Sequence, residues 1–155
     1  MDQLQVRKAE PADAAAVGRL LGSLGHALPD DETASRLRWF SRSGADHLLV
    51  AVSGGEAVGV LTLTVVPRLV RDGPFARISF LGVPEGPDLR WIERALIGEA
   101  ERLARRHRCT AMEVMVDRHP ADDAEGGLAT LGYRASTEDR VRCVKPLPPP
   151  TTVRI

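Results

Sequence analysis

The chain has 155 residues, 43% apolar and 27% charged, which is the range of a folded domain and excludes a disordered or fibrous protein. Its 21 Lys and Arg residues equal its 21 Asp and Glu residues, so no excess of positive charge favours nucleic acid as a partner. Cys109 and Cys143 lie in no zinc-like spacing, and no apolar run is long enough to span a bilayer. We therefore expect a cytoplasmic protein with reduced thiols, without a metal site and without a membrane segment.

The N-terminal part predicts one strand and two helices. Residues 4–9 alternate apolar and polar side chains, as a strand does. A helix follows, because Pro11 suits a first helical turn and four apolar residues then fall on one face. These are Val17, Leu20, Leu21 and Leu24. A second helix is predicted from about residue 29 to residue 40, opened by the acidic run DDE. Its inward residues are Ala34, Leu37 and either Trp39 or Phe40.

The middle of the chain predicts a meander of three strands. The runs HLLVAVS and EAVGVLTLTVV are rich in β-branched residues and are separated by Gly54-Gly55, a dipeptide typical of tight hairpins. We expect these two strands to pair antiparallel. The turn RDGP at residues 71–74 then leads into a third strand, FARISFLGV.

The residues after position 88 predict the best-defined helix, since an apolar stripe recurs at steps of three and four. The stripe consists of Leu89, Ile92, Leu96, Ala100 and Leu103. A short strand over 111–116, a weak helix over 121–131 and a final strand or hairpin over 133–147 follow. We expect a single domain over residues 1–147 and an extended, Pro-rich tail over residues 148–155.

The element order β-α-α-β-β-β-α-β-α-β resembles that of the GNAT N-acetyltransferase superfamily over roughly residues 4–147. Four stretches carry the resemblance: VRKAEPADAAAVGRLL, HLLVAVSGGEAVGVLTLTVVP, ERALIGEAERLARRHRC and LATLGYRAS. The resemblance implies an α/β (α+β) fold with a mixed, mostly antiparallel sheet flanked by about four helices. It also implies acetyl-CoA or another acyl-CoA between two splayed central strands, with its pyrophosphate on the central helix, and a small-molecule or peptide amine as acceptor.

The turn before the central helix departs from the family pattern. GNAT proteins carry Q/R-x-x-G-x-G/A here, because the glycines let backbone N–H groups touch the pyrophosphate. Alignment on ERALI puts Asp88 in place of the cationic or amide residue, and Trp91 and Glu93 in place of the glycines. Asp88 suits the N-cap, where its carboxylate takes N–H groups that a phosphate uses, and both carboxylates place negative charge near the positive end of the helix. The Trp91 indole either fills the phosphate space or swings aside.

The resemblance nevertheless assigns the donor site to this turn and to the strand end before it. We expect backbone amides around Gly82 to hold the pantetheine, and Arg90 to replace the missing pyrophosphate contacts. The candidate set is Leu81, Gly82, Val83, Asp88, Leu89, Arg90, Trp91, Ile92 and Glu93.

Amine acetylation needs a base for the ammonium and an acid for the departing thiolate. In the family the base is often a carboxylate on the strand that corresponds to FARISFLGV, which has none, although some members deprotonate the acceptor through water. The acid is commonly a tyrosine at the position of Leu128, and Tyr133 is interpreted as a core aromatic. His119 is the catalytic candidate, with a solvent-exposed loop histidine as the alternative.

The acceptor side is assigned to residues near the first helix and on the third meander strand. His26 follows the helix beside which the family builds its acceptor pocket, and Arg77 and Ser79 lie on the strand without a carboxylate. Trp39 and Phe40 are interpreted as core or interface residues, with a pocket wall as the alternative.

Two main functions remain open, beside an altered reaction on a CoA thioester or on a carrier-bound acyl group. One is a GNAT-type N-acyltransferase with an atypical donor site. The other is a catalytically inactive GNAT-like protein that binds a partner or senses a ligand. In either case a homodimer is the default expectation.

Overall fold

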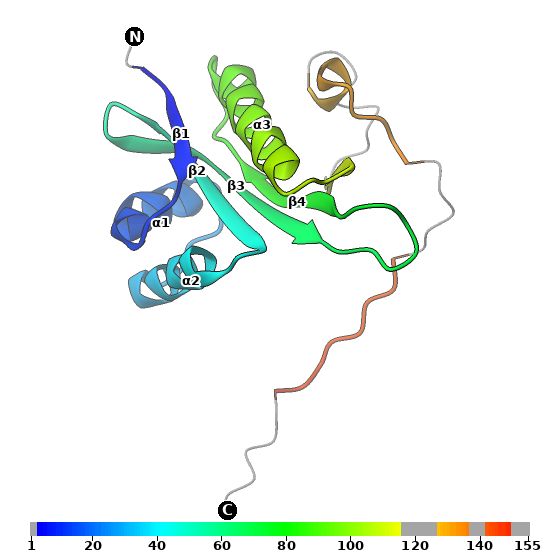
Figure 1. Ribbon diagram of the computed structural model, residues 1–155. Coiled ribbons are helices and arrows are strands. Elements are labelled where there is room, and N and C mark those ends of the chain that lie inside the picture. Colours follow the sequence, from blue (N-terminus) through cyan, green and yellow to red (C-terminus); the bar gives the residue numbers. More distant parts are fainter. Residues whose placement is uncertain (1–2, 116–126, 137–141, 150–155) are drawn as a thin grey trace, which may run out of the picture.

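The computed structural model describes residues 3–115, 127–136 and 142–149, which form a five-stranded sheet with helices on both faces (Figure 1). The strands are β1 (Gln5–Lys8), β2 (Asp46–Ser53), β3 (Glu56–Val66), β4 (Phe75–Gly82) and β5 (Ala111–Val114), in the spatial order β1-β2-β3-β4-β5. β1 to β4 pair antiparallel, and β5 pairs parallel with β4. The predicted mixed, mostly antiparallel sheet is confirmed.

The α-helices within the described residues are α1 (Ala14–Ser23), α2 (Asp30–Arg42) and α3 (Leu89–Arg106). α1 and α2 lie on one face of the sheet and α3 lies on the other (Figure 1). Two 3-10 helices are also present, η1 (Pro11–Asp13) and η3 (Leu128–Leu131). The number of α-helices is therefore three rather than about four in the described residues, because the described end of the predicted 121–131 helix is a single 3-10 turn.

The sheet separates two apolar clusters, one for each face. Along β3 the side chains alternate, so that Val60 faces α1 and α2 while Leu61 and Leu63 face α3. The cluster on the α3 face is built around Leu61, Leu63, Ile78, Leu96 and Ile97. The cluster on the opposite face, beneath α1 and α2, is built around Val17, Leu20, Leu37, Val50 and Val60.

Close contact between α3 and β3 depends on Gly59. A Cβ atom at this position would lie 2.8 Å from Ile92 Cγ2 and 2.9 Å from Leu96 Cδ1. The first two turns of α3 therefore pack directly on the backbone of β3, and this packing fixes where the helix begins relative to the end of β4.

The hairpin and the bulge beside it follow from local sequence. Gly54 and Gly55 adopt φ values of 57° and 78°, so the predicted glycine turn joins β2 to β3. Between β3 and β4, Thr62 lies opposite Phe80 whereas Leu63 lies opposite Ile78, which leaves Ser79 as an extra residue in β4. Such a β-bulge bends the strand and re-aims its side chains.

The predicted final strand is wrong for the residues that the structure describes. Residues 133–136 and 142–147 belong to no strand, and residues 142–149 are exposed and run away from the sheet (Figure 1). The described part of this stretch finds no neighbouring strand to pair with.

The described ranges contain neither a membrane-spanning helix nor a metal-binding group of side chains. No helix there is both long and apolar enough to cross a membrane. In the same residues no group of three His, Cys, Asp or Glu side chains comes together in a way that would hold a metal ion.

Candidate functional site

The last residues of β4 lie between the features that make up the candidate site. β5 pairs with β4 from Phe75 to Ile78, and the last bond on this side runs from the Met115 N–H to the Ile78 carbonyl at 3.0 Å. On the other side, β3 stays paired as far as Gly82. Within the described residues, positions 80–82 therefore pair with β3 alone, and they lead directly into the turn before α3.

Two hydroxyl groups meet at the bulge. The Oγ atom of Ser79 lies 3.1 Å from Oγ1 of Thr62, at hydrogen-bonding distance. Ser79 is exposed and Thr62 is half-buried on the face that carries α1 and α2. The predicted acceptor residue Ser79 is thus placed beside the end of β4 together with a partner that the sequence did not indicate.

Arg77 is occupied by a carboxylate from the neighbouring strand. Its Nε donates to Oε2 of Glu113 at 2.8 Å, and its guanidinium lies 5.2 Å from the centre of the Phe75 ring. Sequence reasoning missed Glu113, because only the β4–β5 register, in which Arg77 lies opposite Glu113, brings the two together. Arg77 is therefore held in place by an ion pair rather than presented as an isolated cation.

The turn before α3 differs from the prediction at Asp88. The carboxylate of Asp88 makes no capping hydrogen bond, so the prediction that it takes the first N–H groups of the helix is wrong. The backbone carbonyl acts instead, accepting from the Ile92 N–H at 2.9 Å, and the Leu89 N–H donates to the Gly86 carbonyl at 3.3 Å. The physical reason is the Asp88 backbone, which already has helical angles (φ −94°, ψ −1°) rather than the extended ones of a capping residue.

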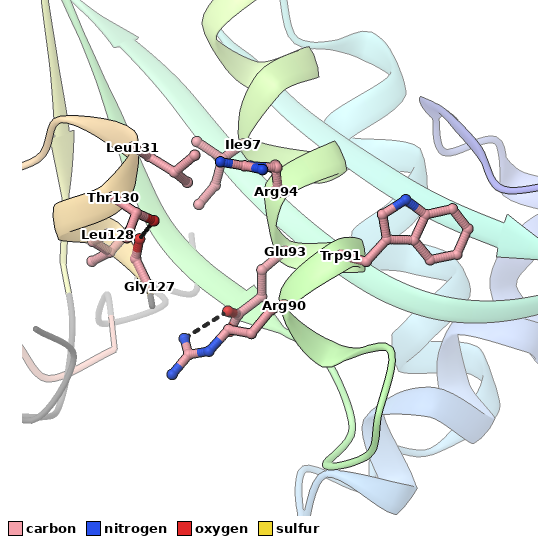
Figure 2. Close-up of a pocket in the computed structure, with 9 residues that line it drawn as sticks. All are labelled: Arg90, Trp91, Glu93, Arg94, Ile97, Gly127, Leu128, Thr130 and Leu131. Carbon is pink, nitrogen blue, oxygen red and sulfur yellow. Dashed lines mark hydrogen bonds and ion pairs between the residues drawn. The ribbon is translucent and has the colours of Figure 1, made fainter. Parts of the chain in front are cut away.

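Two arginines and one carboxylate lie on consecutive turns of α3 (Figure 2). Arg90 Nη1 donates to Glu93 Oε2 at 3.1 Å, and the Glu93 side chain is only 16% exposed. Arg94, one turn further along, is exposed and makes no ion pair with the described residues. Glu93 begins the second turn of α3 and is partly neutralised by Arg90, so it opposes an anion less than a bare carboxylate would.

These residues line a groove between α3 and η3, which we call the α3–η3 groove. It has a volume of about 370 Å³, and α3 contributes Arg90, Trp91, Glu93, Arg94 and Ile97 to it. The opposite wall consists of Gly127, Leu128, Thr130 and Leu131. The groove is therefore apolar on the η3 side and carries its charge on α3.

Trp91 does not block this groove. Its side chain leaves α3 in a direction away from Leu128 and Thr130 (Figure 2), and the residue is 44% exposed. The indole therefore points away from the η3 wall of the groove, and its effect on a bound phosphate stays a prediction.

The remaining donor candidates are placed around the start of α3 as supporting residues. Leu81 and Val83 pack against the cluster on the α3 face, and Ile92 is buried within it. A Cβ atom at Gly82 would lie 2.8 Å from Leu24 Cδ1 and 2.9 Å from Phe80 Cε1, so a larger residue there would require these side chains to move. The side chains of this part of the set build the core, and its contacts with a ligand would come from the backbone.

A second cavity lies on the opposite face, between α1, α2 and the sheet, and we call it the α1–α2 pocket. It has a volume of about 340 Å³, and its floor is formed by Leu48, Val60, Thr62 and Phe80. Its walls include Leu21 of α1, Leu37 and Phe40 of α2, and the loop residues His26 to Leu28. Thr62 and Phe80 connect this pocket to the end of β4.

Three residues singled out in the sequence lie at or near this pocket. His26 lines it and packs edge-on against Phe80, with the ring centres 5.6 Å apart. Phe40 forms part of the pocket wall, whereas Trp39 on the next position of α2 is 68% exposed. The pocket therefore brings together His26, from the loop after α1, and Phe40, from α2.

Tyr133 and Leu128, the two described residues considered for the acid, have contacts away from the end of β4. The hydroxyl of Tyr133 donates a hydrogen bond of 2.8 Å to the carboxylate of Glu101, which lies in the fourth turn of α3. Burial, followed by this bond, raises the pKa of Tyr133 well above its usual range. Leu128 packs against the core and lines the α3–η3 groove. His119 lies outside the described residues.

The comparisons with known proteins concern the fold. No protein-family model and no curated protein sequence matches the chain. A GNAT family acetyltransferase from Staphylococcus aureus superimposes with a TM-score of 0.71 at 16% identity, over 93% of this chain and 100% of that one. The chain has the GNAT acetyltransferase fold.

Two further structures with this GNAT fold differ in what their descriptions say. The aminoglycoside N-acetyltransferase AAC(6')-Iy, solved in complex with CoA, gives a TM-score of 0.73 at 16% identity over 94% of this chain and 96% of that one. A structure described as a transcriptional regulator from Bacillus halodurans gives 0.74 at 21% identity over 92% and 100%. At these identities the likeness establishes the architecture, and function has to be argued from the site.

Proposed function

We propose that the protein is a GNAT-type N-acyltransferase that moves an acetyl or other acyl group from acyl-CoA to an amine, with an atypical donor site. The observation that carries this proposal is the end of β4. Residues 80–82 pair with β3 alone among the described residues, Phe80 lines the α1–α2 pocket, and Gly82 leads into the turn that begins α3. An acceptor in the pocket and a donor along α3 would therefore meet at this strand end.

The donor phosphates would be held by side chains more than by glycine amides. Arg90 and Arg94 line the same groove on α3, and guanidinium groups bind phosphate oxygens through charge-assisted hydrogen bonds. The first turn of α3 adds backbone N–H groups and the positive end of the helix dipole. Glu93 offsets part of this charge, so we expect weaker CoA binding than glycine amides and an unopposed cation would provide.

The chemistry requires a neutral amine at the thioester. Two carboxylates lie on the acceptor face, but Asp46 accepts hydrogen bonds from Ser43 and Thr64, and Glu113 accepts one from Arg77. Because both are already engaged, we assign deprotonation of the ammonium to solvent at the exposed Ser79 hydroxyl, which is hydrogen-bonded to Thr62. The amine nitrogen then attacks the thioester carbonyl carbon, a C–N bond forms, the C–S bond breaks, and CoA leaves as the thiol after taking a proton.

The second candidate is a catalytically inactive GNAT-like protein that binds a ligand or partner. It is supported by the combined loss of the motif glycines and of the usual base and acid at Trp91, Glu93 and Leu128. The likeness to a structure described as a regulator agrees with it. A protein of this kind would bind CoA or an amine without releasing thiol.

Thermal unfolding with acetyl-CoA and longer acyl-CoAs tests the donor site. A ligand at about 100 times its Kd adds about 2.7 kcal/mol to the free energy of unfolding, which is a rise in Tm of roughly 5–10 °C for a domain of this size. Arg94→Gln should reduce this rise, whereas Arg106→Gln, in the last turn of α3 and outside the groove, should leave it intact.

Thiol release with a panel of amines then separates the two candidates. Binding together with thiol release supports the acyltransferase, and binding without release under any amine supports the inactive alternative. If no acyl-CoA raises Tm at millimolar concentration, CoA is not the donor and the proposal is wrong.

A further inference from the structure

The lining of the α1–α2 pocket restricts the kind of molecule that it accepts. Nine of the thirteen residues that line it are apolar, and no described carboxylate is among them. The aromatic rings of Phe40 and Phe80 and the side chain of Leu28 contribute to the apolar surface. An apolar group that enters the pocket loses its contact with water and gains stabilisation in proportion to the buried area.

The charge that lines the pocket is positive. Arg36 of α2 lines the pocket, and its Nε donates to Glu32 Oε1 at 2.8 Å. The side chains of this pair are 57% and 49% exposed, and such surface pairs contribute about 0–1 kcal/mol. Arg36 is therefore able to exchange Glu32 for a carboxylate on a ligand, which it would bind through two parallel hydrogen bonds.

The same lining excludes acceptors with several positive charges. An ammonium group buried without an acceptor carries a large desolvation penalty. The hydroxyl oxygens that could accept from it are few, since the pocket lining holds those of Thr33, which is 1% exposed, and of Thr62, which is hydrogen-bonded to Ser79. A polyamine or an aminoglycoside would leave most of its ammonium groups without a partner next to Arg36.

We infer that the acceptor is a small amine with an apolar body and a carboxylate, of which a hydrophobic α-amino acid is the simplest form. This inference rests on the proposed function, because it takes the α1–α2 pocket as the acceptor side of that reaction. The volume of about 340 Å³ lies at the lower end of the range for small-ligand sites, about 300–1,000 Å³. The apolar side chain would lie against Phe40 and Phe80, the carboxylate would pair with Arg36, and the product would be an N-acyl amino acid.

Binding measured without any acyl-CoA tests this inference independently of turnover. Calorimetric titrations would use L-phenylalanine, L-leucine, L-phenylalaninamide and kanamycin. We expect the two amino acids to bind, the amide to bind about tenfold more weakly because it lacks the carboxylate, and kanamycin to show no binding. Arg36→Gln should abolish the preference for the acid over the amide, and Arg38→Gln, on α2 but outside the pocket, should preserve it.

A steric variant provides a second readout. Ala27 is exposed and lines the pocket, so Ala27→Trp should fill the pocket and abolish amino-acid binding while the fold remains. Ala15→Trp, on the exposed side of α1, is the matched control. Equal binding of acid and amide, binding of kanamycin, or full binding by Ala27→Trp would overturn the inference.

The two proposals fail separately. If acyl-CoA raises Tm and none of the amino acids binds, the inferred acceptor class is wrong and the transferase proposal stands. If L-phenylalanine binds as expected and no acyl-CoA does, the pocket chemistry stands and the acyl donor is wrong.

Discussion

The two sides of the β4 end differ in what their residues contribute to the fold. On the α1–α2 side, the pocket is lined by side chains such as Leu37 and Val60 that also build a core cluster. On the α3 side, the residues that depart from the GNAT pattern are Asp88 and Trp91, both exposed, and Glu93, which contacts Arg90. Two of the three departures therefore lie at exposed positions, and all three change what α3 presents to a ligand.

The two faces of α3 differ in the same way: one builds the core and the other lines the groove. The inward face of α3, with Ile92 and Leu96, packs on β3 as a GNAT fold requires. The outward face, with Arg90, Glu93 and Arg94, carries the charges of the α3–η3 groove. Variants on the inward face should alter stability, and variants on the outward face should alter affinity for CoA.

The largest effect is expected at Gly59, which holds α3 against β3. In Gly59→Ala the added methyl group would overlap Ile92 and Leu96, and such overpacking costs about 1–3 kcal/mol of unfolding free energy. Urea denaturation measures this change. The control is Gly98→Ala, at an exposed position of α3 with no atom near the added methyl, which should stabilise the helix by about 0.5–1 kcal/mol.

Gly59→Ala also tests whether the α3 side and the α1–α2 side bind their ligands independently. Displacement of α3 should reduce the rise in Tm caused by acyl-CoA and leave binding to the α1–α2 pocket unchanged, since the pocket has no residue from α3. A Gly59→Ala protein with wild-type stability would show that α3 is not seated as closely as the structure indicates.

The sequence predicted the fold well because the fold depends on local patterns. Apolar residues at helical spacing predicted α1, α2 and α3, and Gly54-Gly55 predicted the hairpin between β2 and β3. These signals are periodicity and turn chemistry, which a single stretch of chain contains. The prediction of a final strand was wrong for the described residues, since a local sequence pattern does not by itself supply a neighbouring strand.

The site was less predictable because it depends on register. The pairing of Arg77 with Glu113 and the contact of Ser79 with Thr62 exist only once β4 is aligned with both neighbours and carries its bulge. The direction of the Trp91 indole likewise depends on packing that no sequence pattern specifies. The assignments of the donor residues and of His119 remain predictions.

A smaller effect, on the pH dependence of stability, is expected at His47, where the C-terminal end of α3 contacts the sheet. His47 of β2 is 6% exposed, its Nε2 has no hydrogen-bond partner among the described residues, and its ring centre lies 5.1 Å from that of His107 at the end of α3. Burial, followed by His107 and Lys8, lowers the pKa of His47, and Asp46 opposes this only in part.

The sign of the pH dependence follows from that depression. Between the lowered pKa of folded His47 and the ordinary value of 6.5, the unfolded chain binds more protons, so stability is full above about pH 6.5 and is lost as the pH falls below it. Tm measured from pH 7.5 to pH 5 should decline for the native protein and decline less for His47→Leu. Parallel curves for the two proteins would assign the acid sensitivity to other groups.

The smallest effect is expected at Glu93, on the ligand side of α3. Glu93→Gln removes a negative charge from the α3–η3 groove but keeps the shape of the side chain, and an exposed charge pair of this kind contributes about 0.2–1 kcal/mol. Calorimetry with CoA should therefore show an affinity about 1.5- to 5-fold higher, and the gain should shrink in high salt because the charges are screened. Glu99→Gln, whose carboxylate pairs with Arg102 outside the groove, should bind CoA as the native protein does. Weaker binding of CoA by Glu93→Gln would contradict the view that Glu93 opposes the ligand. It would mean that Glu93 supports the site by orienting Arg90, so that an ordered ion pair on α3 takes the place of the glycine amides.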